Sequence, residues 1–181
     1  SGLRQLAMTA AAENAEQRMQ LLVLLSRVIV VKEGMAGTVS EGLAHQIEAL
    51  LPHVAKRESR FQALEQLRIY HGGAGNTGSS LAFAEQLLRM AEAGKRIDAI
   101  VYGSTLLGIS HLAVGDLNAA GVCLRRGVER TEESPRQEPT PKPFGRPSGL
   151  HMLLILQAIT AWLKGDAERS RDCERQARAM S

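Results

Sequence analysis

The residues best spaced for chemistry are three glycines, Gly73, Gly75 and Gly78, whose segment satisfies the pattern GxGxxG. In dinucleotide-binding proteins such glycines let the backbone approach a pyrophosphate where a strand turns into a helix. On that interpretation residues 67–70 form one strand and residues 97–102 the next. A dinucleotide-binding α/β enzyme domain that uses this glycine turn is therefore one hypothesis for the chain.

Two departures from the motifs weigh against a nucleotide site. The acidic residue expected at the end of the second strand is absent, because Asp98 lies at its beginning and Gly103 follows it. Treated as a P-loop, the same stretch has Ser79 where the phosphate-binding lysine should stand. We therefore prefer a glycine-rich turn between two helices and keep the dinucleotide-binding domain as the alternative.

The histidines, serines and cysteines show no catalytic or metal-ligating spacing. No HExxH or HxxxH pair occurs, although His71, His111 and His151 are 40 residues apart. Cys123 and Cys173 lie in helical patterns without CxxC spacing, which indicates reduced thiols in a cytoplasmic protein. We expect no catalytic residue, no metal and no cofactor.

Composition favours helices and excludes several functional classes. The 181 residues are 44% hydrophobic and 23% charged, as in a globular domain, but only 3% aromatic, which favours helices over a β-sandwich. The net charge of +3 is spread along the chain, so direct nucleic-acid binding is not expected. The most apolar run, residues 21–31, is too short to span a membrane. The start, Ser1-Gly2-Leu3, lacks an initiator methionine and a secretion signal, and predicts a fragment of a longer protein.

Apolar residues recur with a period near 3.6 through most of the chain, as in Leu22, Leu25 and Ile29. Glycine-containing breakers separate these runs. The pattern predicts an all-α chain of about four helical hairpins. The expected helix pairs are 3–32 with 40–56, 58–71 with 79–94, 97–114 with 116–132, and 149–164 with 166–180.

The turn glycines Gly34, Gly75, Gly115 and Gly165 are separated by 41, 40 and 50 residues. A period near 40 is typical of an α-solenoid, so we expect one helical-repeat domain over residues 1–181, with hairpins at about 3–56, 58–94, 97–132 and 149–180. The long third interval contains residues 133–147, with five of the six prolines. We expect this segment to be an extended surface loop.

Small residues around Gly115 indicate the type of repeat. A tetratricopeptide repeat places small and apolar residues at fixed offsets from its turn glycine, and here those offsets hold Leu107, Gly108, His111, Ala120, Leu124 and Gly127. The match around Gly165 is weaker. Around Gly75, Tyr70 and Leu87 match only if the turn has one extra residue.

Several segments together resemble the helical region of large bacterial signalling ATPases. They are Glu16–Leu25 with Lys32-Glu-Gly34, Ala84–Leu88, Leu106–Ala120 and Ala161–Asp166. In that family a DNA-binding winged helix or a cyclase domain precedes an ATPase module, and tetratricopeptide-like repeats follow it. The resemblance covers roughly 15–180 and implies a cytoplasmic, non-catalytic regulatory or sensor module of a bacterial transcriptional or signalling regulator, with ATP chemistry outside it.

Stacked tetratricopeptide hairpins curve, and their inner helices line a concave side. We expect a partner or effector to dock there, on Phe61, Arg68, Tyr102, Thr105 and Trp162. The expected partners are another protein, an ATPase or DNA-binding domain of the same chain, or a small effector, with a homo-oligomer left open and no membrane contact. The alternative is that these residues are internal packing.

Overall fold

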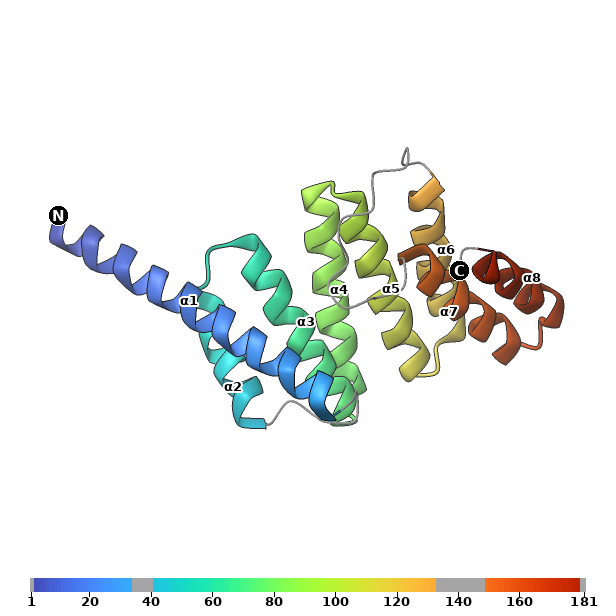
Figure 1. The fold of residues 1–181 in the computed structure, drawn as a ribbon, viewed down its shortest axis with the longest axis horizontal. Coiled ribbons are helices and arrows are strands. Elements are labelled where there is room, and N and C mark those ends of the chain that lie inside the picture. The colour runs from blue at the N-terminus through green and yellow to red at the C-terminus, as the bar shows by residue number, and fades with distance from the viewer. Residues whose placement is uncertain (1, 34–40, 133–148, 180–181) are drawn as a thin grey trace. The chain divides into compact units, whose positions relative to one another are not determined.

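The computed structural model describes residues 2–33, 41–132 and 149–179, and these ranges are almost entirely helical (Figure 1). They contain eight α-helices, one short 3-10 helix and no strand, which confirms the prediction of an all-α chain. The predicted turn at Gly34 and the Pro-rich segment 133–147 lie outside the described residues. The helices are α1 (Gly2–Glu33), α2 (Glu41–Leu50), η1 (Leu51–His53), α3 (Arg57–Gly73), α4 (Thr77–Gly94), α5 (Ile97–Ala113), α6 (Leu117–Glu132), α7 (Gly149–Leu163) and α8 (Ala167–Arg178).

The largest error in the predicted helix ends concerns the second helix, which was expected to continue to residue 56. Instead α2 ends at Leu50, and residues 51–53 form the 3-10 helix η1. Pro52 explains the change, because it has no backbone N–H and its ring crowds the carbonyl four residues earlier. The chain then becomes extended at Val54, which is buried.

Three of the connections between helices have the same geometry. Gly75, Gly115 and Gly165 have φ of 78°, 81° and 81°, in the left-handed region that favours glycine. The next residue, Asn76, Asp116 or Asp166, places a side-chain oxygen where it caps the following helix. The capping oxygens accept from the backbone N–H groups of Ser79, Ala119 and Arg169, at 3.3, 2.9 and 3.1 Å.

The turn at Gly75 contains no extra residue, so Tyr70 and Leu87 do not take the repeat positions that depended on one. Because it matches the Gly115 turn residue for residue, Leu67 and Ser80 take the positions of Leu107 and Ala120. All four side chains are buried. The turns at Gly75 and Gly115 therefore have the same length and geometry.

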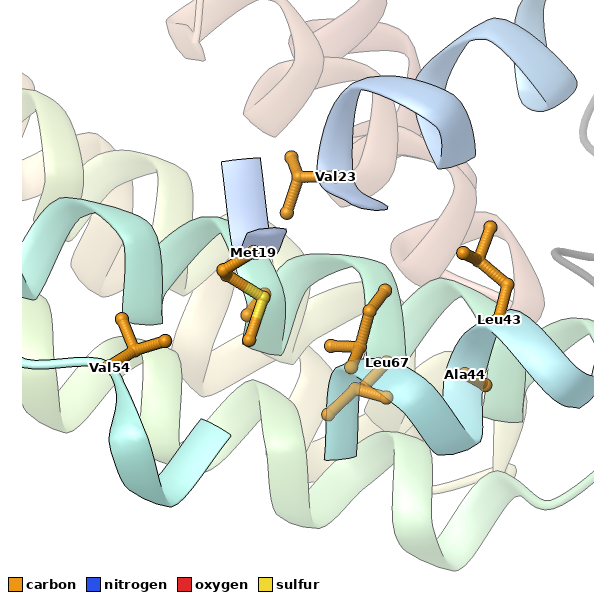
Figure 2. Close-up of a cluster of buried hydrophobic side chains, with 8 residues drawn as sticks. Met19, Val23, Leu43, Ala44, Val54 and Leu67 are labelled. Carbon is orange, nitrogen blue, oxygen red and sulfur yellow. The ribbon is translucent and has the colours of Figure 1, made fainter. Parts of the chain in front are cut away.

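The chain divides into two compact units, residues 1–83 (unit 1) and 84–181 (unit 2). In unit 1, helices α1, α2 and α3 pack against one another. Figure 2 shows their shared core, with Met19 and Val23 from α1, Leu43 from α2 and Leu67 from α3. Met19 and Leu67 are fully buried, and burying a side chain of this size contributes about 1.5–3 kcal/mol.

In unit 2, α7 packs on both α5 and α6, and α8 packs on α7. Glycines allow α5 to approach α6 closely and α6 to approach α7 closely. A β-carbon at Gly108 would lie 2.5 Å from Cδ2 of Leu124, and one at Gly127 would lie 2.9 Å from Cδ1 of Leu153. Leu124 and Leu153 are fully buried, so α5, α6 and α7 form one core.

Candidate functional site

The five residues predicted for a concave face come from both units. Phe61 and Arg68 lie on α3 in unit 1, whereas Tyr102, Thr105 and Trp162 lie on α5 and α7 in unit 2. Arg68 and Thr105 are buried, Phe61 and Tyr102 are half-buried, and Trp162 is 68% exposed. The hydroxyl of Thr105 donates to the carbonyl of Val101 at 2.8 Å, within its own helix. A concave binding face that joins all five stays a prediction.

The glycine-rich segment has a helical context on both sides. Residues 67–70 belong to α3 and residues 97–102 belong to α5, so neither is the strand that the dinucleotide-binding hypothesis needs. Gly73 is the last residue of α3, Gly75 lies in the turn and Gly78 lies in α4. The segment is therefore a turn between two helices, as we preferred, and the strand–turn–helix interpretation is wrong.

The titratable and nucleophilic side chains of the described residues do not assemble into a reactive centre. Nε2 of His71 lies 3.0 Å from Oε1 of Glu48, and the His71 ring stacks on Phe83 with centroids 5.3 Å apart. Burial raises the pKa of the thiols of Cys123 and Cys173, which disfavours the reactive thiolate. Within the ranges that the structure describes, no group of three or more histidine, cysteine, aspartate or glutamate side chains could hold a metal ion.

Among the side chains that the structure describes, four exposed apolar ones form a stripe on α1. Leu21, Leu24, Leu25 and Val28 are 67%, 56%, 51% and 60% exposed. Their spacing of i, i+3, i+4 and i+7 places them on one side of the helix, over two turns. Such contiguous exposed apolar side chains mark interaction surfaces more often than isolated ones do. No described helix is both long and apolar enough to cross a bilayer.

The opposite side of α1 fixes the helix in unit 1. Met19 and Val23 are buried in the core, and Ser26, also buried, donates to the carbonyl of Leu22 at 2.8 Å. A carboxylate and a guanidinium add polar contacts to α3: Glu16 accepts a hydrogen bond from Ser59, and Nη2 of Arg27 lies 3.6 Å from Oε2 of Glu65. The apolar stripe is therefore held on a rigid element.

Two cations bracket the stripe. Arg18 lies three residues before Leu21 and Lys32 four residues after Val28, and both are exposed. These spacings place both side chains on the same side of the helix as the stripe, about 21 Å apart along its axis. We define the α1 face as Arg18, Leu21, Leu24, Leu25, Val28 and Lys32.

Sequence reasoning missed the α1 face for a physical reason. The spacing of Leu22, Leu25 and Ile29 predicted one apolar side, but Leu22 and Ile29 pack against the core whereas Leu25 is half exposed. A second series, from Leu21 to Val28, runs along the other side. The α1 face could have been predicted from the apolar residues on both sides of this helix. A single core can bury only one side of a helix, so the other side must stay exposed or contact a partner.

No protein-family model, curated protein or solved structure matches the chain. The α1 face and the helical packing are therefore the features from which function can be inferred. The face offers apolar contacts and two positive charges, but no reactive group. Binding, rather than catalysis, is the chemistry that such a surface can perform.

Proposed function

We propose that the chain is a non-catalytic regulatory module of tetratricopeptide-like helical repeats, from a cytoplasmic bacterial signalling or transcriptional regulator. Its α1 face docks an acidic amphipathic helix of a protein partner. The observation that carries the proposal is the exposed stripe Leu21–Val28 between Arg18 and Lys32. A helix from another domain of the same parent chain would meet the same chemical requirement.

The apolar stripe supplies attraction of limited strength. Each of its four side chains is roughly half exposed, so covering one removes about half of its apolar surface from water and contributes about 1 kcal/mol. Association costs at least about 4 kcal/mol in lost translational and rotational freedom. The stripe alone therefore gives weak binding, and a specific complex needs the flanking charges and further contacts. Weak, reversible docking suits a regulatory module.

The charges decide between an acidic partner and a second copy of the chain. If two α1 faces paired in parallel, Arg18 would approach Arg18 and Lys32 would approach Lys32. If they paired antiparallel, Arg18 would approach Lys32. Like charges meet in both cases, and this disfavours self-association. A helix with acidic residues at both ends of its apolar side satisfies both cations.

The repeat type is supported by the turns and by the packing of unit 2. The left-handed glycines at Gly75, Gly115 and Gly165 are each followed by a capping Asn or Asp. In addition, α7 contacts both helices of the preceding hairpin, which is how stacked helical hairpins bury a continuous core. The close approach at Gly108 matches the small position of a tetratricopeptide repeat.

The proposal predicts a charge preference that can be reversed. Two synthetic helical peptides of equal length would carry leucines at i, i+3, i+4 and i+7, flanked by glutamates in one and by lysines in the other. We expect the chain to bind the acidic peptide about tenfold more tightly, equivalent to 1.4 kcal/mol, in fluorescence anisotropy at low salt. The double variant Arg18→Glu/Lys32→Glu should prefer the basic peptide.

A matched control makes the same charge change elsewhere. Arg171→Glu/Arg175→Glu alters two exposed arginines of α8 and should leave the peptide preference unchanged. An equal reversal in this control, or no saturable binding of either peptide, would contradict the proposal. A wild-type dimer in sedimentation velocity that Leu24→Asp converts to a monomer would contradict it too, because a second copy would then cover the α1 face.

A further inference from the structure

Unit 2 contains a small cavity where α6 approaches the turn between α7 and α8. Its volume is about 70 Å³. Pockets for drug-sized ligands measure roughly 300–1,000 Å³, so this cavity has room for a small chemical group and not for a large metabolite. Arg125 of α6 and Gln157 of α7 line it from one helix each. Lys164 and Asp166 belong to the turn between α7 and α8, and Arg169 belongs to the first turn of α8.

Positive charge dominates the cavity. Arg125, Lys164 and Arg169 contribute three cations, whereas Asp166 contributes one carboxylate. That carboxylate is already engaged, because its Oδ1 accepts from the backbone N–H of Arg169 at 3.1 Å and caps α8. The N-terminus of α8 adds the positive end of a helix dipole. The cavity therefore has an excess of two positive charges, which suits a dianion.

One of the residues that line the cavity, Gln157, carries an unpaired buried donor. Gln157 is only 8% exposed, and its Nε2 is buried without a hydrogen-bond partner. The other end of this amide is occupied, because its Oε1 accepts from Sγ of Cys173 at 3.7 Å. A buried N–H donor without an acceptor is costly, and most buried donors in folded proteins are paired. An acceptor oxygen that reached this amide would satisfy it.

Gly121 keeps one side of the cavity open. A β-carbon there would lie 3.6 Å from Nη1 of Arg125 and 3.8 Å from Cγ2 of Thr160, at ordinary contact distances. A longer side chain would extend into the space between α6 and α7. The position is thus suited to a variant that fills the cavity.

We infer that this cavity binds a phosphate group, either as the free ion or as the end of a small phosphomonoester. Guanidinium groups pair with phosphate oxygens through two parallel hydrogen bonds, and the Lys164 ammonium adds a point charge. A carboxylate ligand would neutralise only one of the two excess charges. The site lies in unit 2 and does not depend on docking at the α1 face.

The test is isothermal titration calorimetry of the full chain with inorganic phosphate at constant ionic strength. We expect saturable binding that Arg125→Ala weakens by about tenfold or more, since the variant removes a charge-assisted pair. Gln157→Leu keeps the side-chain volume and removes the donor, and Gly121→Met fills the cavity; both should weaken binding with helix content unchanged in circular dichroism. The matched control is Arg126→Ala on the same helix, whose guanidinium pairs with Glu92 at 2.8 Å, and it should bind phosphate as the wild type does.

A second titration with glycerol phosphate separates the two sources of the group. Tighter binding of the ester identifies a phosphorylated metabolite as the ligand, and equal or weaker binding identifies free phosphate. The inference is wrong if phosphate does not bind saturably, or if Arg126→Ala weakens binding as much as Arg125→Ala. Arg18→Glu/Lys32→Glu should leave phosphate affinity unchanged, so the failure of this site and the failure of the α1 face can be told apart.

Discussion

Replacing Gly108 by leucine is expected to destabilise unit 2 by about 1–3 kcal/mol or more, because the contact between α5 and α6 has no room for a side chain. A β-carbon at this position would already lie 2.5 Å from Cδ2 and 2.7 Å from Cγ of Leu124. Leu124 is fully buried, so it cannot move aside without disturbing the core that it shares with Val101 and Leu153.

Thermal unfolding followed by circular dichroism measures this effect. For a unit of this size, 1 kcal/mol corresponds to a change in Tm of about 4–8 °C. Gly78→Leu is the matched control, because a β-carbon at Gly78 in α4 meets nothing within 4 Å. The control should be neutral or slightly stabilising, since leucine favours a helix more than glycine does. A Gly108→Leu chain with an unchanged Tm would contradict the close packing of α5 on α6.

Replacing Leu24 and Leu25 together by aspartate should lower the affinity for the acidic peptide about 100-fold, equivalent to 2.7 kcal/mol. The double variant removes two of the four apolar side chains of the α1 face and places two negative charges where the acidic helix must lie. Leu24 and Leu25 are 56% and 51% exposed, so their loss should cost little stability.

The control for this variant is Val122→Asp on α6, where the apolar side chain is equally exposed, at 56%. It should keep the affinity of the wild type. Fluorescence anisotropy gives the affinities, and circular dichroism checks that both variants keep their helix content. Retained binding by Leu24→Asp/Leu25→Asp, or an equal loss in Val122→Asp, would show that the peptide binds elsewhere.

The helices could be predicted from sequence because the signals that place them are local. The 3.6-residue period and the turn glycines at Gly75, Gly115 and Gly165 act within a few residues, and the structure has a helix in each of the eight predicted ranges. The ion pair between Glu174 and Arg178, four residues apart on α8, was predictable for the same reason. Pro52 was also a local signal of a helix end, but the predicted range of the second helix, 40–56, did not take it into account.

The surfaces could not be predicted because they depend on contacts between distant segments. Packing against α2 and α3 decides which side of α1 is buried, and Leu21 and Leu22 cannot be distinguished by residue type. The cavity of unit 2 brings Arg125 near Lys164 and Arg169, which lie about 40 residues further along the chain with no motif to connect them. The alternating charges of residues 164–178 indicate only a salt-bridged surface helix, which agrees with the ion pairs on the exposed side of α8 and gives no sign of the cavity at its start.

Docking of an acidic helix on the α1 face is tested most directly by NMR of the methyl-labelled chain during titration with the acidic peptide. The methyl signals of Leu21, Leu24, Leu25 and Val28 should shift saturably, with one common dissociation constant. The methyl signals of Val122 and Ile159, which are also exposed but lie on α6 and α7, should not move. Unchanged signals on α1, or shifts centred on Val122 or Ile159, would contradict the proposed docking face.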